Sequence, residues 1–359
     1  MREIFLTIVV PVYKVNYIQL HRCIDSLIHQ EKSKKFYEVL LIDDGSPDAC
    51  GEICDDYSKK YSFIHVIHQE NQGLSVVRNN GVDLAKGEWV AFVDGDDWLE
   101  PNFVKNAVEQ VGKSKPETDI LIWDGIAEAN EYSTEIKFLD IDDTQVQEFS
   151  GKYKELLIDR IIPRHVSKSD IKRCTDIGVT WSRIYRKELL KKNKIVNIPN
   201  LRVMQDSIFN LWAFEYAKII TYQFKPIYHY SLYDTSISNK YDRNITSTMK
   251  ELYGYFADYI RKCHNTEEYW QRLYNRTVRM LVKCLFKFYA NPLNEDSMFE
   301  RKRQMANDLS AVEFQTALER CDMRGQDFKF NFILFLLKHK FYILSILCSS
   351  IFVKFRRYL

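Results

Sequence analysis

The stretch that decides the fold is WVAFVDGDDW, residues 89–98, in which an apolar run opens directly into acidic residues. Its first five residues have the length and composition of a buried β-strand. Three carboxylates follow within four positions, Asp94, Asp96 and Asp97, and charges this close repel one another unless a cation joins them. Two of these side chains can reach one divalent cation that would also bind substrate phosphates. The structural alternative is an acidic turn that caps the following helix.

Outward from this stretch, short β-branched runs alternate with helix-period segments over the first 125 positions. The candidate strands are Phe5–Val10, Glu38–Ile42, Phe63–Ile67, Glu88–Val93 and Asp119–Trp123. Between the first two, one amphipathic helix is indicated by apolar residues at i, i+3, i+4, i+7 and i+8, namely Leu20, Cys23, Ile24, Leu27 and Ile28. The alternation predicts an α/β fold with a parallel sheet flanked by helices, whose ligands bind beyond the carboxyl ends of the strands.

The other strand ends are polar as well. The second strand ends in residues 43–46, Asp-Asp-Gly-Ser, whose carboxylates could accept hydrogen bonds from a base or ribose or could simply form a turn. The first strand ends in residues 11–13, Pro-Val-Tyr, where the aromatic ring could stack on a base. Between the third and fourth strands, a glycine turn leads into a helix that carries Arg78. This arginine could bind a phosphate, hold a carboxylate in place or form a surface salt bridge.

Composition excludes several classes of protein. The 359 residues are 46% hydrophobic and 28% charged, which suggests two or three domains with a core and excludes disordered and fibrous chains. A net charge of only +2 argues against a general nucleic-acid binder. The eight cysteines form no CxxC pair, so we expect reduced thiols and no structural zinc. Neither a P-loop nor a GxGxxG fingerprint is present.

The first 104 residues resemble the family 2 glycosyltransferases of GT-A fold, especially bacterial enzymes that build capsule, exopolysaccharide or lipopolysaccharide repeats. The resemblance rests on five ordered blocks, residues 9–13, 41–46, 71–75, 78–81 and 92–98. It implies a GT-A fold with a Rossmann-like, mostly parallel central sheet. It also implies inverting transfer of a sugar from a nucleotide donor, commonly UDP-linked, with Mn²⁺ or Mg²⁺ as cofactor.

The resemblance also implies roles for individual residues. The nucleotide site would be lined by Pro11, Tyr13, Asp44 and Arg78. Asp94 and Asp96 would form the DXD pair of the family, with Asp96 as the direct metal ligand and Asp94 nearer to the ribose and the donor sugar.

Two later blocks resemble the same family more loosely. Residues 181–190 are followed by residues 204–209, in which Asp206 looks like the catalytic base and Gln205 stands where relatives usually have Glu. The structural alternative for Asp206 is an acid at a helix N-terminus. Residues 225–230 resemble the segment that closes over the diphosphate. Within them, His229 could complete the metal shell, contact phosphate or be structural.

Two basic regions suggest where the acceptor and a membrane would bind. The stretch 160–173, with Arg164 and Lys168, is predicted to form part of the acceptor mouth together with Trp181. The tail, residues 328–359, has six Lys or Arg and no acid among its apolar residues. It fits a helix pair lying on an anionic bilayer surface, or a helix packed on the catalytic domain. A membrane-bound tail would suit a polyprenyl-diphosphate-linked acceptor at the inner leaflet.

We therefore expect a cytoplasmic glycosyltransferase, peripheral on the inner face of the plasma membrane, that glycosylates a hydroxyl of a glycan acceptor. Residues 1–115 would form the nucleotide-sugar-binding half of the catalytic domain, residues 116–240 the acceptor-binding half, and residues 241–359 a helical extension. The apolar run 341–353 is shorter than the roughly 20 residues of a membrane-spanning helix. The alternatives are a metal-dependent nucleotidyltransferase and a non-catalytic, membrane-attached partner protein.

Overall fold

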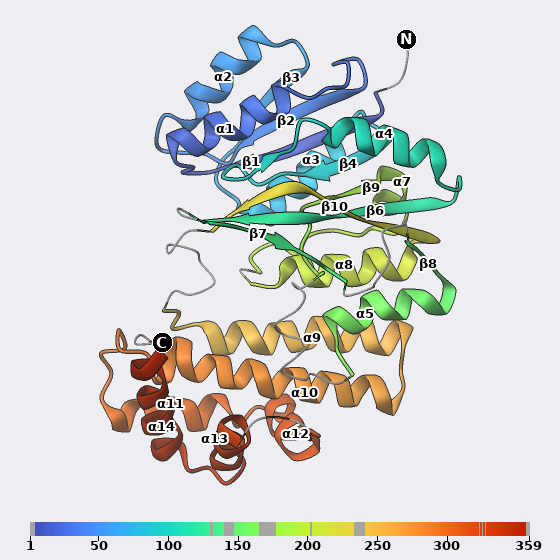
Figure 1. The fold of residues 1–359 in the computed structure, drawn as a ribbon. Helices are drawn as coiled ribbons and strands as arrows, with labels where there is room; N and C mark the ends of the chain where they lie inside the picture. Colours follow the sequence, from blue (N-terminus) through green and yellow to red (C-terminus); the bar gives the residue numbers. More distant parts are fainter. Residues whose placement is uncertain are drawn as a thin grey trace. The chain divides into compact units, whose positions relative to one another are not determined.

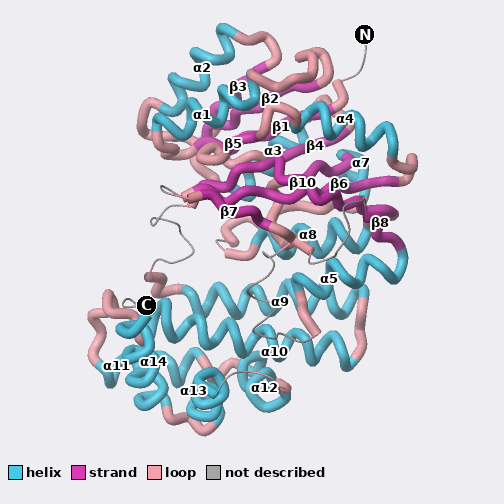
Figure 2. Tube along the Cα trace, in the orientation of Figure 1, coloured by secondary structure: helices cyan, strands magenta, loops and turns pink. Residues whose placement is uncertain are grey.

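The computed structural model describes residues 4–129, 132–139, 147–164, 177–201, 203–232, 241–322, 324, 326 and 328–356. The chain divides into two compact units, Met1–Ile161 with Arg173–Tyr233, and Ile162–Lys172 with Asp234–Leu359. The described part of the first unit is built around a ten-stranded sheet, and that of the second is helical (Figures 1 and 2).

The strands and helices of the first unit alternate through its N-terminal part, as the sequence predicts. The strands are β1 Leu6–Val12, β2 Tyr37–Asp43, β3 Ile64–His68, β4 Trp89–Phe92, β5 Trp98–Leu99, β6 Thr118–Glu128, β7 Ser133–Ile136, β8 Gln147–Ser150, β9 Arg183–Arg186 and β10 Ile219–Ser231. The helices are α1 Tyr17–Ile28, α2 Cys50–Lys60, α3 Leu74–Leu84, α4 Phe103–Lys113, α5 Glu155–Ile161, α7 Lys187–Lys192 and α8 Gln205–Tyr216, with a 3₁₀ turn at Gly151–Lys154.

The sheet has a parallel half and a mixed half. Its order is β3-β2-β1-β4-β9-β6-β10-β5, with β7 added to β6 and β8 added to β10. β1 pairs in parallel with β2 and β4, and β2 with β3. In the mixed half β6 and β10 are parallel, whereas β9 runs antiparallel to both β4 and β6. The expected α/β class is confirmed, and the parallel half puts the ends of β1, β2 and β4 at one edge.

Burial explains why these segments became strands. Every residue of β2 and β4 is buried, which requires the continuous apolar runs seen in the sequence. The buried residues of α1 are the five that the helical spacing singled out, Leu20, Cys23, Ile24, Leu27 and Ile28. The cysteines of α2, Cys50 and Cys54, are buried thiols, as expected for helix packing.

The second unit consists of helices in its described part. They are α9 Ile245–Cys263, α10 Glu267–Cys284 with a π turn at Leu285–Tyr289, α11 Met298–Asp308, α12 Val312–Arg320, α13 Phe328–Lys338 and α14 Tyr342–Arg356. Among the described residues of the whole chain, no helix combines the length and the apolar composition that crossing a bilayer needs.

Candidate active site

The acidic turn after β4 lies directly against the end of β1. The turn closes with a hydrogen bond from the Asp97 amide to the Asp94 carbonyl, 3.0 Å long. A Cβ atom at Gly95 would lie 3.0 Å from the Pro11 carbonyl oxygen and 3.1 Å from a methyl group of Val15. Because Gly95 has no side chain, the turn can approach the C-terminal end of β1 closely. This close approach brings the acidic side chains to the carboxyl edge of the sheet.

The structure separates the three acids of this turn into two kinds. Asp97 is buried, and its carboxylate accepts hydrogen bonds from the Tyr228 hydroxyl at 2.6 Å and from the Ser231 amide at 2.8 Å. Burial and the neighbouring carboxylates raise the pKa of Asp97 well above its usual value. The carboxylate of Asp97 is therefore occupied by hydrogen bonds within the protein. Asp94 and Asp96 remain as the acids of this turn that can contact a ligand.

Asp96 is available for a ligand. No other described residue donates a hydrogen bond to its carboxylate, whereas its backbone carbonyl accepts from Ser231 and Arg22. Burial, and then the charge of Asp94, raise the pKa of Asp96 to about 6. A cation bound to this carboxylate would relieve both effects.

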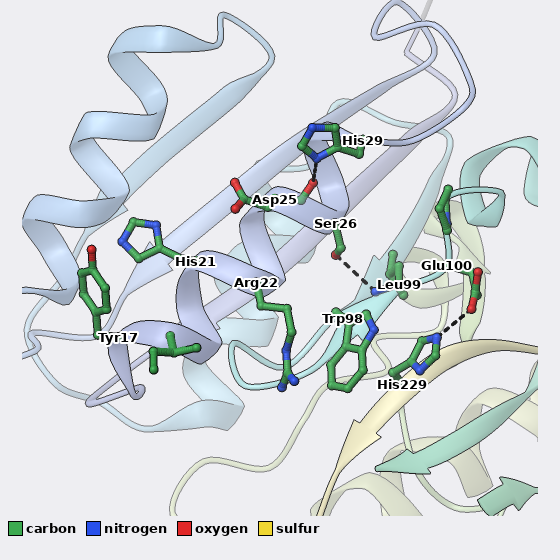
Figure 3. A pocket seen from close by; sticks show the side chains of 12 residues that line it. Tyr17, His21, Arg22, Asp25, Ser26, His29, Trp98, Leu99, Glu100 and His229 are labelled. Atoms are coloured by element: carbon green, nitrogen blue, oxygen red, sulfur yellow. Dashed lines mark hydrogen bonds and ion pairs between the residues drawn. The ribbon is translucent and has the colours of Figure 1, made fainter. Parts of the chain in front are cut away.

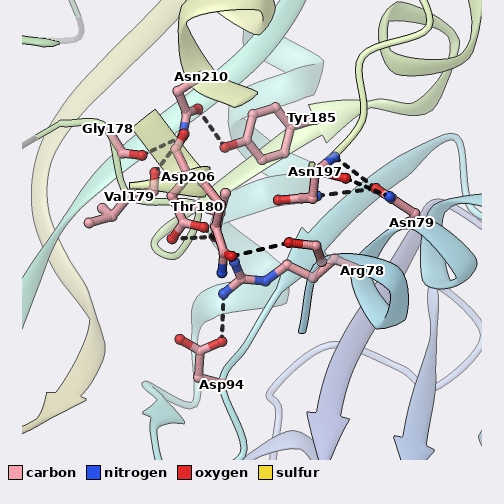
Figure 4. A network of polar contacts seen from close by, with 12 residues as sticks. Arg78, Asn79, Asp94, Gly178, Val179, Thr180, Tyr185, Asn197, Asp206 and Asn210 are labelled. Carbon is pink, nitrogen blue, oxygen red and sulfur yellow. Dashed lines mark hydrogen bonds and ion pairs between the residues drawn. The ribbon is translucent and has the colours of Figure 1, made fainter. Parts of the chain in front are cut away.

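Arg78 joins the acidic turn to the candidate base (Figure 4). Its side chain is 1% exposed, and its two terminal nitrogens donate to Asp206 Oδ1 at 2.6 Å and to Asp94 Oδ1 at 2.8 Å. Of the three roles that the sequence left open for this arginine, the structure therefore supports holding carboxylates in place. At 1% exposure, Arg78 offers almost no surface to a phosphate.

The position of Arg78 depends on how closely α3 packs on β1. Gly73, with φ of +88°, precedes the helix and turns the chain into it. One turn after Arg78, a Cβ atom at Gly81 would lie only 2.3 Å from a methyl group of Val9. The helix can approach the strand this closely because position 81 has no side chain, and this places Arg78 beneath the ends of the strands.

Asp206 lies in the first turn of α8 and is held from several sides. Besides Arg78, the Thr180 hydroxyl donates to its Oδ2 at 3.3 Å. The Asn210 amide nitrogen donates to the backbone carbonyls of residues 178, 179 and 206, which fixes the segment before Thr180 on the helix. Burial raises the pKa of Asp206, and the charge of Arg78 opposes this rise. The carboxylate remains 25% exposed, so a substrate can reach it.

Gln205, which stands where relatives usually have Glu, also has a partner. Its side-chain oxygen accepts a hydrogen bond of 3.1 Å from the Ser75 hydroxyl at the start of α3. The N-terminal turns of α3 and α8 are thus joined both through this bond and through Arg78.

The remaining predicted nucleotide residues lie at the same edge of the sheet. Tyr13 follows β1 and is exposed, so its ring is accessible for stacking. Asp44 is buried, and its carboxylate accepts from the Gln69 side chain and from the amides of Gln72 and Gly73, all within 2.9 Å. In this structure Asp44 therefore shapes the loop before α3.

Both ring nitrogens of His229 contact glutamate side chains. Its Nδ1 is 2.8 Å from Glu128 Oε1, its Nε2 is 2.8 Å from Glu100 Oε1, and its ring stacks on Trp98. The other face of Trp98 is covered by the Arg22 guanidinium, 3.5 Å from the ring centre. Arg22, Trp98, Glu100 and His229 line a groove of about 670 Å³ beside α1 (Figure 3). Metal binding through either ring nitrogen of His229 would require the carboxylate contact of that nitrogen to break.

The three residues predicted to bind the acceptor differ in burial and in their contacts. Trp181 is only 5% exposed and stacks between Tyr228 and Tyr230, with ring centroids 4.9 and 5.5 Å away. Because Trp181 is buried against these two tyrosines, it presents little surface to an acceptor. The Arg164 guanidinium lies 3.0 Å from Glu268 of α10. Lys168 is outside the described residues.

Sequence reasoning missed several residues that shape this site. Tyr228 donates to Asp97 and accepts a hydrogen bond from the Asp94 amide, so one hydroxyl fixes two parts of the acidic turn. The Thr180 hydroxyl contacts the carboxylate of Asp206, and the Asn210 side chain contacts its backbone carbonyl. Two features of the sequence could have indicated these residues: Asn210 lies one helical turn after Asp206, and Tyr228 is adjacent to His229.

Comparisons with known proteins point to one class of enzymes. Residues 7–169 match the family model of glycosyl transferase family 2. EpsH of Bacillus subtilis (strain 168), a protein named as a glycosyltransferase, is 26% identical to this chain. The similarity extends over 356 residues and covers 98% of this chain and 97% of EpsH. The poly(ribitol-phosphate) beta-glucosyltransferase of Bacillus spizizenii is 28% identical over 237 residues, covering 63% of this chain and 32% of that enzyme.

A solved structure shares the fold. S. aureus TarS 1–349 in complex with UDP-GlcNAc superimposes with a TM-score of 0.65 at 20% identity, covering 99% of this chain and 92% of that chain. These findings argue against the nucleotidyltransferase and the non-catalytic alternatives. The chain is therefore a glycosyltransferase that carries a glycosyl transferase family 2 domain over residues 7–169 and has the GT-A fold.

Proposed function

We propose that the protein transfers a sugar, with inversion, from a UDP-linked donor to a hydroxyl group of a glycan acceptor. The observation that carries this proposal is the buried Arg78, which holds Asp94 of the acidic turn and Asp206 of α8 on one guanidinium. The arrangement puts a carboxylate that can act as a base next to the acids expected at the donor. The UDP-GlcNAc bound by TarS, which has the same fold, supports a UDP donor.

Asp206 would act as the general base. As the acceptor oxygen attacks the anomeric carbon from the face opposite the nucleotide, the Asp206 carboxylate takes the hydroxyl proton. Burial raises the pKa of this carboxyl, which makes it a better proton acceptor, while Arg78 keeps it ionised. Thr180 and Arg78 fix the direction of its two oxygens.

The donor side fits a divalent cation, Mn²⁺ or Mg²⁺. The residues that would hold it are Asp96, whose carboxylate no other described residue uses, and Asp94, of which Arg78 bonds only one oxygen. No cluster of three or more His, Cys, Asp or Glu side chains suited to a metal exists in the described part of the chain. A site with so few protein ligands leaves positions for phosphate oxygens. Once bound, the cation would neutralise charge on the departing diphosphate.

The nucleotide would lie at the ends of β1 and β2, next to Pro11, Tyr13 and the loop that Asp44 shapes. The exposed ring of Tyr13 offers a stacking surface for the base. Residues 1–115 would form the donor half of the catalytic domain and residues 116–240 the acceptor half, of which residues 162–172 and 234–240 belong to the second compact unit.

For the acceptor, we propose a glycan of a cell-surface polymer, linked to polyprenyl diphosphate. Support comes from the relative named for poly(ribitol-phosphate) and from the basic, apolar tail, residues 328–359, which would keep the enzyme on the inner face of the plasma membrane. Arg164 and Lys168 remain proposals for binding this anionic acceptor, and a nucleic-acid partner is not proposed.

A panel of UDP-, GDP- and dTDP-sugars, assayed for nucleotide release with and without Mn²⁺, tests donor, metal and activity together. We expect release from a UDP-sugar that needs the metal. Asp206→Asn should abolish transfer but retain UDP binding, because the asparagine cannot take a proton. Normal transfer by a folded Asp206→Asn protein would disprove the proposed base, and metal-independent release would disprove the cation site.

A further inference from the structure

Helix α14 buries two serines together with Tyr342 and Ile346, and the exposed ones among its described side chains are apolar. Ser345 and Ser349 are fully buried, and the hydroxyl of Ser349 has no hydrogen-bond partner among the described residues. The outward side chains of α14 are instead apolar and 42–52% exposed, namely Ile343, Leu344, Leu347 and Ile351. A helix on the surface of a soluble protein normally has the opposite pattern, with its polar side chains in water.

The outward residues of α14 form one continuous stripe. Positions 343, 347 and 351 are four residues apart, and position 344 lies three residues before 347, so all four side chains share a face. Single exposed apolar residues are common, but a contiguous apolar patch marks a surface that another apolar phase covers. The stripe is therefore a candidate interaction surface.

Cations and aromatic rings accompany the stripe at the turn between α13 and α14. Lys338 and Lys340 are exposed there. Phe335 and Phe341 are exposed as well, and the ring of His339 lies 4.4 Å from the first and 6.3 Å from the second. α13 and α14 pack on each other within the second unit (Figure 1). From residue 328 to residue 356 the sequence has five Lys or Arg and no acid.

We propose that this face, made of the α14 stripe with Phe335 and Phe341, lies in the surface of an anionic lipid bilayer. Apolar side chains would enter the boundary between headgroups and acyl chains, and the lysines would contact the headgroup phosphates. At 15 residues, α14 is about 22 Å long, shorter than the roughly 30 Å of the hydrocarbon core, so it would lie in the plane of the membrane.

Charge favours a lipid surface over a second copy of this chain as the occupant. A symmetric dimer through this face would bring two sets of lysines into one interface, and residues 328–356 of neither copy contain an acid to pair with them. Anionic headgroups neutralise the same lysines. The inference specifies how the proposed function would reach a membrane-linked acceptor, and it can fail without affecting the catalytic site.

Vesicle co-sedimentation of the full-length protein tests the proposal. The protein should pellet with vesicles of phosphatidylcholine and phosphatidylglycerol, and only weakly with phosphatidylcholine alone. The double substitution Leu344→Gln and Leu347→Gln should weaken binding by about tenfold or more, because two half-buried leucines are lost. Lys338→Gln and Lys340→Gln should each weaken binding to the anionic vesicles by about fivefold.

The matched control places the same substitutions on other exposed apolar residues of the same unit. Leu293→Gln and Val312→Gln, at positions 69% and 78% exposed, should leave vesicle binding unchanged. Thermal unfolding should show that the stripe variant folds, and its release of nucleotide from a UDP-sugar in solution should match the parent. If that release is absent in both proteins but vesicle binding follows the pattern above, the proposed function fails and the lipid surface stands.

Two results would overturn the inference. One is a parent protein that stays in the supernatant with anionic vesicles, or a stripe variant that binds them like the parent. The other is a concentration-dependent dimer that the stripe substitutions dissociate, with no vesicle binding by the monomer, which would make a second copy the occupant.

Discussion

Replacing Arg78 by methionine should destabilise the catalytic unit and stop transfer. Methionine is similar in length but carries no charge, so the change leaves Asp94 and Asp206 without the cation that both of them contact. Removing one partner of a buried ion pair costs about 3–5 kcal/mol. Because the two carboxylates are 28% and 25% exposed and recover some hydration, we expect the lower end, about 3 kcal/mol.

The loss should also depend on pH. Without Arg78, the pKa of Asp206 loses the charge that opposes its rise on burial, so the folded protein binds this proton more tightly than the unfolded chain. The Arg78→Met deficit should therefore be small at low pH and grow as pH rises and the Asp206 carboxyl ionises. Arg78→Lys keeps the charge but loses the two-nitrogen fork that holds both carboxylates, so the acid limb of the kcat/KM profile of a residually active Arg78→Lys protein should move to higher pH.

Urea unfolding followed by tryptophan fluorescence, at an acidic and at an alkaline pH, measures both effects. A suitable control is Arg186→Met. This arginine is also mostly buried and bonds to Glu88 and the Thr118 carbonyl, away from the acidic turn. The Arg186→Met substitution should lower the free energy of unfolding but leave the turnover of the folded protein unchanged. An Arg78→Met deficit below about 1 kcal/mol, the range of exposed ion pairs, or equal at both pH values, would refute the reasoning.

Three further predictions concern other parts of the chain. Mn²⁺ affinity, followed by calorimetry, should rise with pH through about 6, because the metal needs the ionised Asp96 carboxylate; a flat profile would contradict this ligand. Gly81→Ala should lower the free energy of unfolding by about 1–2 kcal/mol, because the new methyl group overlaps Val9. Gly112→Ala, which meets no atom within 4 Å, should instead stabilise its helix, and similar values for the two variants would contradict the packing argument. Ser349→Ala should raise the free energy of unfolding by about 1 kcal/mol, because it removes a buried hydroxyl without a partner; a loss measured by urea unfolding would contradict this account of α14.

Much of the parallel half of the sheet could be predicted, because the residue pattern within each strand and helix is enough to identify that element. Strands buried on both faces require uninterrupted apolar runs, and a helix against a sheet requires a 3.6-residue stripe, so β2, β4 and α1 follow from their own residues. The acids after β4 could be located for the same reason, since the residues that follow a parallel strand must lie at its carboxyl edge.

The partners of those acids could not be predicted, because they come from distant segments. The sequence determined that this protein has an α/β sheet with acids at its edge and a basic, apolar tail. Only the tertiary structure decided that Arg78 is shared by Asp94 and Asp206, that His229 faces two glutamates, and that α14 buries two serines. Hydrogen-bond direction and burial depend on which elements pack together, and a run of residues does not specify its neighbours in space.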